Sequence, residues 1–175
     1  MAIRAATPED IPAILEIYAP FVKNTAVSFE YTVPTEEEFL KRFQEHTAVY
    51  PWQVWEEAGK VLGYAYAGRA FERAAYAWNA EISCYLAESA RGVVTKLYEK
   101  IEEILRKQGC RKAFAVVTSA NEASVRFHEV IGYQKVVVYP GVGCKFGQWY
   151  DVIWLEKQPL PLDDPEGFPK PWNDL

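Results

Sequence analysis

The stretch EISCYLAESARGVVTKLY, from Glu81 to Tyr98, decides the fold predicted for this chain. It begins as a strand that carries one acidic residue among apolar neighbours, turns through small residues at 89–92, and continues as a helix with apolar positions at helical spacing. The first amides of a helix have no intrahelical partner and carry the positive end of the helix dipole. A strand, turn and helix in this order can therefore hold an anionic group of a ligand with backbone alone.

Length and composition bound the class of protein. A chain of 175 residues is expected to form one domain that buries roughly 70% of the surface its unfolded form exposes. Half of the residues are hydrophobic and 15% are aromatic, which argues against disorder. The net charge of −5, without visible clusters of Lys and Arg, gives no reason to expect nucleic acid as a partner.

The ends and the apolar runs of the chain indicate its compartment. No apolar run approaches the roughly 18–20 residues of a membrane span, and the N-terminus, MAIRAATPED, lacks the apolar core of a secretory signal. Cys84, Cys110 and Cys144 are odd in number and irregularly spaced, which fits neither a disulfide framework nor a zinc site. We therefore expect a cytoplasmic protein with free thiols, no metal and no membrane partner.

Capping residues and hydrophobic periodicity predict the order of the elements. Thr7 and Pro8 are typical of a helix start, and Thr35 with Glu38 forms a capping box. The predicted elements are a strand at 3–6, helices from 7 to 22 and from 35 onward, strands at 52–55, 61–67 and 76–86, a helix at 93–108, a strand at 112–118, a helix at 121–131, and strands at 133–139 and 149–156.

This order predicts an α+β fold. Adjacent strands imply antiparallel pairing, whereas the strand, helix and strand around 93–108 imply one parallel crossover. We expect a mixed, mostly antiparallel sheet of about six to seven strands flanked by about four helices, in a single domain at 1–157. Residues 158–175, rich in Pro and Asp, are expected to form an irregular tail.

Seven motifs, in the same order along nearly the whole chain, resemble one known family. They are IRAATPEDIPAILEIY at 3–18, SFE at 28–30, YPW at 50–52, GYAYAG at 63–68, RAAYAWNAE at 73–81, NEASVRFHEVIGY at 121–133 and GCKFGQWYDV at 143–152. The chain resembles the GNAT acyltransferase superfamily, and within it the phosphinothricin acetyltransferase branch. The resemblance implies the GNAT fold, a homodimer, and transfer of acetyl from acetyl-CoA to the amino group of small amino-acid-like substrates such as phosphinothricin or methionine sulfone and sulfoximine.

Glu81 and His128 are the candidate catalytic residues. A carboxylate in mid-strand, beside Ala80 and Ile82, is costly unless it has a task or a partner, so Glu81 is either a proton acceptor or paired with an Arg such as Arg73. A lone His on a mostly apolar helix is more often a core residue. The resemblance nevertheless implies that His128, four residues before Gly132, protonates the leaving thiolate.

The resemblance also implies which residues bind the cofactor. Cys84, Tyr85 and Leu86 match the segment whose backbone pairs with the pantetheine arm and polarises the thioester carbonyl. Asn121 is expected to cap the helix that follows it, and by resemblance it is also a ligand of the pantetheine arm. One residue can have both roles.

Substrate recognition rests on four further residues. A fixed guanidinium suits an amino-acid carboxylate, and Arg73 matches the family's Arg in a run before Tyr76. Phe29 and Tyr76 are candidate pocket walls, and Lys145 is a candidate contribution from the last hairpin. Each is equally well read as an ordinary surface charge or core aromatic.

The phosphate loop departs from the family pattern. Arg91, Gly92, Val93 and Val94 are the expected pyrophosphate ligands, but the loop is shorter than the family's and Val94 replaces its last glycine. A β-branched side chain there is predicted to crowd the pyrophosphate. The alternative function is therefore a GNAT-fold binding or regulatory protein with weakened acetyl-CoA binding. The transferase reading requires an open groove, expected between the strand and the helix that meet near residue 90.

Overall fold

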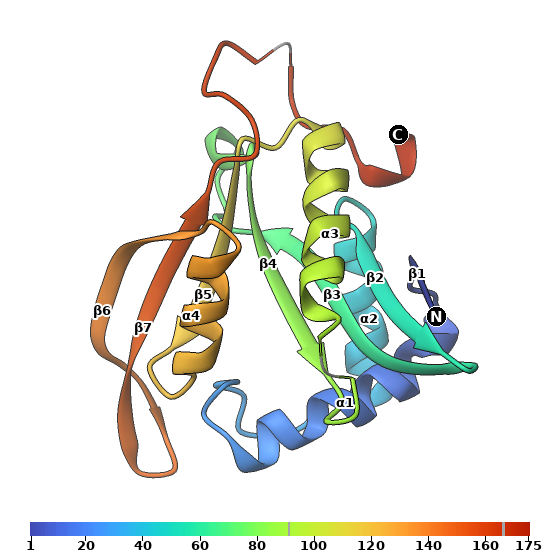
Figure 1. The fold of residues 1–175 in the computed structure, drawn as a ribbon, viewed down its shortest axis with the longest axis vertical. Coiled ribbons are helices and arrows are strands. Elements are labelled where there is room, and N and C mark those ends of the chain that lie inside the picture. Colours follow the sequence, from blue (N-terminus) through green and yellow to red (C-terminus); the bar gives the residue numbers. More distant parts are fainter. Residues whose placement is uncertain (91, 166) are drawn as a thin grey trace.

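One mixed sheet organises the protein. A computed structural model describes residues 1–90, 92–165 and 167–175, and within them seven strands lie in the order β1-β2-β3-β4-β5-β7-β6 (Figure 1). The strands are β1 Ala2–Ala5, β2 Trp52–Glu57, β3 Lys60–Arg69, β4 Asn79–Leu86, β5 Lys112–Thr118, β6 Gln134–Lys145 and β7 Gln148–Lys157. Neighbouring strands are antiparallel except β4 and β5, which are parallel. The predicted mixed, mostly antiparallel sheet is thus confirmed.

Helices cover both faces of this sheet. The α-helices in the described residues are α1 Ile11–Asn24, α2 Glu36–Thr47, α3 Val94–Gln108 and α4 Glu122–Val130. Apolar residues of α1 and α2 pack on Trp52, Val54 and Tyr64 in one core. Residues of α3 and α4 pack on Ala65, Ala67 and other sheet residues in a second core. Because side chains alternate along a strand, the two cores lie on opposite faces.

The helix starts follow the caps in the sequence, with one shift. Thr35 and Glu38 form the predicted capping box, each side chain bonding the backbone amide of the other. The first α-helix begins only at Ile11, because residues 8–10 form a 3-10 turn. In that turn, Asp10 accepts a hydrogen bond from the amide of Thr7 and two from Arg4, which tie the helix start to β1.

Two predicted strand boundaries were wrong. Strand β4 starts at Asn79 instead of Tyr76, because residues 74–76 form a 3-10 helix in which the amide of Tyr76 donates to the Arg73 carbonyl. Strand β6 runs on to Lys145 instead of ending at 139. It passes an irregularity between Tyr139 and Gly143 and then pairs again with β7, which lengthens the last hairpin.

The parallel strands β4 and β5 separate along their length. They pair at Asn79↔Lys112, Ala80↔Ala113 and Glu81↔Phe114. Beyond this point β4 continues to Leu86 and β5 to Thr118, and the ribbons diverge toward the lower half of Figure 1. Backbone groups on the facing edges of the two strands are therefore left without a strand partner.

The last residues lie against the opposite end of the sheet. After β7 the chain passes above the beginnings of β4 and β5 and ends beside the C-terminal end of α3 in a short 3-10 helix, Trp172–Asp174 (Figure 1). None of the described helices is both long and apolar enough to cross a lipid bilayer.

Candidate active site

Glu81 lies at the last paired position of β4 before the strands part. Residues 81, 83 and 85 point to one face, and Tyr85 packs in the core under α1 and α2, so the Glu81 side chain lies on that face. The described residues offer its charge no ion pair, and Arg73 is not its partner. Burial raises the pKa of Glu81 to about 7, so near neutral pH it can both accept and release a proton.

Residues around Glu81 that the sequence did not single out come from β3 and α2. Gly68 pairs with Glu81, and Tyr66 pairs with Ser83. The His46 ring lies above Gly68, with Cε1 and Nδ1 at 3.3 and 3.4 Å from the place a Cβ would take there. Alternation from Glu81 would have predicted Ser83, but nothing in the sequence connects His46 to this strand pair.

His128 lies on the other face of the sheet, in α4. Its Nδ1 is 2.7 Å from the carbonyl of Ser124, and its Nε2 is 2.7 Å from the hydroxyl of Tyr98 in α3. Since a carbonyl only accepts, Nδ1 is assigned the proton and Nε2 accepts a hydrogen bond from Tyr98. Burial lowers the pKa of His128, which keeps the ring neutral near pH 7. The sequence did not single out Tyr98.

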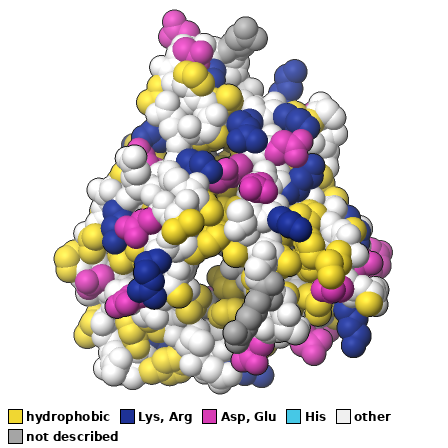
Figure 2. All heavy atoms as spheres, in the orientation of Figure 1, with side chains coloured by type: hydrophobic (Ala, Val, Ile, Leu, Met, Phe, Trp, Pro, Cys, Tyr) yellow, Lys and Arg dark blue, Asp and Glu magenta, His cyan; other side chains and the backbone are white. Residues whose placement is uncertain are grey.

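A narrow cavity opens where β4 and β5 separate. Its volume is about 70 Å³. Its lining comes from both strands and both helices of that face, and includes Ile82, Ser83, Cys84, Tyr85, Tyr98, Ala115, Thr118, Asn121, Ser124 and His128. Figure 2 shows the molecule hollowed in the lower half of the view, with hydrophobic side chains around the hollow. The groove expected near residue 90 therefore lies between two strands, which corrects its predicted walls.

Four of the predicted ligand and catalytic residues meet at this cavity: Cys84, Tyr85, Asn121 and His128. Asn121 also caps α4, its side chain accepting from the amide of Ser124. Leu86 instead lines a larger hollow of about 920 Å³, bounded by α1, the β2–β3 turn and 86–88, which contains neither Glu81 nor His128. Burial raises the pKa of the Cys84 thiol to about 12, so this cysteine is not a nucleophile.

The loop before α3 has the geometry of a helix N-terminus with a glycine turn. Gly92 has a φ of +84°, which a residue with a side chain adopts only with strain. Val93 and Val94 are partly buried against the core beneath α3. The Val94 side chain thus contributes to packing, and the crowding of a pyrophosphate by Val94 stays a prediction. Arg91, the remaining predicted ligand, lies outside the described residues.

The predicted substrate residues are placed in two groups. Arg73 is exposed at the start of the 3-10 helix 74–76, and the exposed Tyr76 ring packs against Phe71 with centroids 5.0 Å apart. Phe29 lies against Gly143 of the last hairpin and near Tyr150. Arg73 and Tyr76 thus come from the β3–β4 connection, and Phe29 comes from the α1–α2 connection.

Lys145 is 1% exposed, and its charge is already satisfied within the protein. Its Nζ donates to the carbonyls of Val22 and Ser28 at 2.7 and 2.6 Å. These bonds fasten the last hairpin to the end of α1, and a substrate contact would have to displace one of them. The described residues contain no group of three or more His, Cys, Asp and Glu side chains placed to hold a metal ion.

Parallel strands that separate around a cavity, with a helix N-terminus beside them, agree with the acyltransferase fold that the sequence motifs led us to expect, and comparison with known proteins identifies the family. The family model described as an acetyltransferase (GNAT) domain matches residues 3–154. The chain therefore belongs to the GNAT acetyltransferase family.

Relatives within that family are similar over nearly their whole length. The chain is 33% identical to phosphinothricin N-acetyltransferase of Streptomyces viridochromogenes over 162 residues, 91% of this chain and 88% of that protein. It is 33% identical to the L-methionine sulfoximine/L-methionine sulfone acetyltransferase of Salmonella typhimurium, covering 90% and 94% of the two chains. The crystal structure of a phosphinothricin acetyltransferase from Sinorhizobium meliloti in complex with acetyl-CoA superposes with a TM-score of 0.90 at 32% identity, covering 95% and 94%.

Proposed function

We propose that this protein transfers acetyl from acetyl-CoA directly to the amino group of a small amino-acid-like substrate, with Glu81 as general base. One observation carries the proposal. The Glu81 carboxylate, which has no ion-pair partner among the described residues, lies at the last β4–β5 pair, on one face of the sheet. The Tyr98–His128 pair lies on the other face and lines the cavity that opens just beyond that pair. A proton acceptor and a proton donor thus stand on opposite sides of one reaction space.

The residues present fit the cofactor. The β4 edge from Ser83 to Leu86, unpaired toward β5, offers backbone groups to an extended pantetheine arm, and Asn121 lies on the other side of the gap. The amides at the start of α3, with Gly92 before them, suit a pyrophosphate. The bound thioester supplies the activated acetyl group. The acetyl-CoA complex of the Sinorhizobium meliloti relative supports this assignment.

The protein's own residues then supply positioning and proton transfer. Glu81 accepts a proton from the substrate ammonium, because its raised pKa lies nearer to that of an amine than an ordinary carboxyl does. The departing thiolate takes its proton from the Tyr98 hydroxyl, which donates to Nε2 of His128, and the second proton that the amine releases as the amide forms replaces it. Holding both reactants in line contributes on the order of 7–11 kcal/mol in favourable cases.

The class of the acetyl acceptor is proposed from the names of the relatives and from the positive charge of Arg73. The names of the relatives specify phosphinothricin and methionine sulfoximine or sulfone, which are amino acids with a tetrahedral polar group. Arg73 is the proposed ligand of the acceptor carboxylate, with Phe29 and Tyr76 as walls. Steady-state rates with phosphinothricin, methionine sulfone, methionine sulfoximine and free amino acids test this class, and activity confined to protein lysines would contradict it.

Calorimetry with acetyl-CoA separates the transferase from the alternative of a GNAT-fold binding or regulatory protein. The short phosphate loop was the ground for that alternative, whereas the partial burial of Val94 against the core supports retained binding. We expect saturable heat at micromolar to millimolar acetyl-CoA. Absence of heat at millimolar ligand would favour the alternative.

We further propose that the protein works as a homodimer through β6. This strand is the edge of the sheet, and its exposed apolar residues, with those of the following turn, are Val136, Val137, Val138, Tyr139, Val142, Phe146 and Trp149. An apolar edge strand of this kind invites pairing with another chain. Light scattering of the wild type and of Val137→Lys tests the assembly, and a monomeric wild type would contradict it.

A further inference from the structure

The C-terminal segment bonds to the chain just before β4. The Trp78 ring stacks on Phe168 with centroids 5.0 Å apart and an interplanar angle of 19°. The indole Nε1 of Trp78 also donates to the carbonyl of Gly167 at 3.2 Å. Trp78 immediately precedes β4, so the segment holds the beginning of the strand that carries Glu81.

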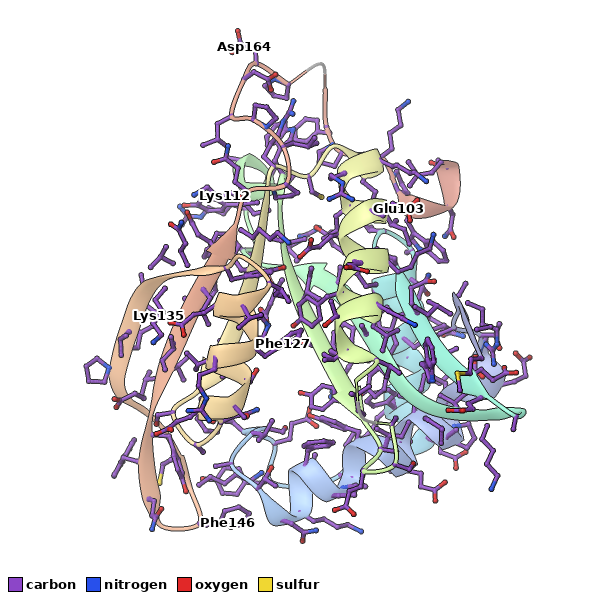
Figure 3. All side chains as sticks on the ribbon, in the orientation of Figure 1. Glu103, Lys112, Phe127, Lys135, Phe146 and Asp164 are labelled. Atoms are coloured by element: carbon purple, nitrogen blue, oxygen red, sulfur yellow. The ribbon has the colours of Figure 1, made fainter. Side chains whose placement is uncertain are left out.

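The same segment bonds to the chain just before β5. Arg111 pairs with Asp163 at 2.9 Å, and Arg111 immediately precedes β5. Gln108 and Lys170 exchange two hydrogen bonds, Nε2 of Gln108 to the Lys170 carbonyl at 2.8 Å and the Lys170 amide to the Gln108 carbonyl at 3.0 Å. In Figure 3, Asp164 marks the segment at the end of the molecule where Lys112 begins β5.

A third attachment reaches the opposite helical layer. Trp172 donates from Nε1 to the carbonyl of Thr47 at 2.9 Å and from its amide to the carbonyl of Val49 at 3.1 Å. Gln108 bonds the Val49 carbonyl as well, at 2.8 Å. The segment is therefore fixed at both its ends and in its middle, to three different parts of the chain.

These attachments surround the point about which β4 and β5 diverge. The two strands share the pairs Asn79↔Lys112, Ala80↔Ala113 and Glu81↔Phe114, and the Trp78 carbonyl accepts the amides of both Arg111 and Lys112. Three residue pairs fix the angle between β4 and β5 poorly. A small rotation of one strand where they pair becomes a large displacement where they have separated. Bonds that hold the two strands just before this ladder limit that rotation.

We propose that residues 163–165 and 167–173 act as a clasp that sets the separation of β4 and β5, and that Trp78 and Phe168 are positioning residues for the reaction. The clasp contacts neither substrate nor the reacting atoms. It keeps Glu81 and the pantetheine edge of β4 at a fixed distance from β5. The kinetic consequence rests on the proposed function, whereas the effect on strand separation does not.

Hydrogen exchange and kinetics of Phe168→Ala test the clasp, with Phe168→Trp as the conservative variant and Leu162→Ala as control. Leu162 lies just before this segment and is 64% exposed, against 66% for Phe168, so the two truncations remove similarly exposed side chains. In Phe168→Ala we expect amide exchange at the paired residues of β4 and β5 to accelerate at least fivefold. We also expect the KM for acetyl-CoA to rise about three- to tenfold and kcat to fall. Phe168→Trp should keep the exchange rates and the kinetic constants near those of the wild type, and so should Leu162→Ala.

A second variant, Arg111→Met, removes the Asp163 attachment on the β5 side and should accelerate the same amides. Wild-type exchange at β4 and β5 in both Phe168→Ala and Arg111→Met would overturn the clasp. Faster exchange spread evenly over the whole sheet would also overturn it, because that is global destabilisation. A wild-type protein without acetyltransferase activity would instead contradict the proposed function and leave the exchange test valid.

Discussion

Glu81 on β4 stands directly opposite Gly68 on β3, so no side chain from that strand covers the carboxylate. The imidazole of His46 lies above the same glycine, so close that a β-carbon at this position would touch the ring. The half-buried Glu81 carboxylate therefore lies beside a glycine and an imidazole, without an ion-pair partner among the described residues. Burial is what raises the pKa of this carboxylate.

Glu81→Gln should lower kcat/KM for the amine by about 10²–10⁴-fold, the usual contribution of a general base. In the wild type, the rate should rise with pH through a pKa of about 7, because only the deprotonated Glu81 accepts a proton. The glutamine variant should lack this rise. Steady-state kinetics from pH 5.5 to 9 measure both, and a variant within threefold of wild type would remove Glu81 from the mechanism.

Glu81→Gln should also stabilise the protein at high pH. Burial raises the folded pKa above the unfolded value, so the folded state favours the protonated acid and loses stability as pH rises from about 4.5 through about 7. The gain from the variant should be near zero at pH 4 and reach at most on the order of 3 kcal/mol above pH 8. Urea unfolding at the two pH values checks the sign, and an equal effect at both would contradict the assigned burial.

Tyr98→Phe should lower kcat by about 10–100-fold while leaving the KM for the amine unchanged. The variant keeps the ring in the core but removes the hydroxyl that is 2.7 Å from Nε2 of His128. His128→Phe should lower kcat similarly, and the double variant should be no slower than either single variant if the two act as one donor. Additive losses would show two independent roles.

The sequence predicted elements best where local signals agreed. Strand β5 was predicted with its observed bounds, because a β-branched, apolar run follows a glycine C-cap at Gly109. The start of β4 was wrong because backbone bonds within 73–77 form a turn that apolar alternation does not reveal. Strand propensity alone does not show that a local turn competes with the strand.

Site residues were found from the sequence where a polar group interrupts an apolar pattern. Glu81 met that condition and lies where β4 and β5 part, whereas Asn121 was predicted as a helix cap and by resemblance, and it lines the cavity. Tyr98 did not meet the condition, because an aromatic residue at helical spacing is equally typical of a core. Contacts between distant segments, such as Trp78 with Phe168, carry no periodic signal at all.

Val94→Gly, which introduces the glycine of the family pattern, should destabilise the protein without tightening acetyl-CoA binding. Val94 packs on the core, so the variant loses this packing in addition to the helix penalty of glycine, about 2–3 kcal/mol in total. Thr95→Gly, at an exposed position in the same turn, should cost about 1 kcal/mol. Urea unfolding and calorimetry measure the two effects, and a severalfold tighter Kd in Val94→Gly would show that Val94 does crowd the pyrophosphate.

Lys145→Met should cost about 2–4 kcal/mol of unfolding free energy, because it leaves the carbonyls of Val22 and Ser28 without their donor in a buried site. Lys135→Met is the control, since Lys135 is half exposed, pairs with Glu129 on the surface and should cost less than about 1 kcal/mol. Urea unfolding of both variants measures the difference. If Lys145→Met were as stable as the control and instead raised the KM for the amine tenfold, the lysine would bind substrate in place of fastening the hairpin. We expect the stability loss, because two short bonds to main-chain carbonyls already occupy the ammonium at this site.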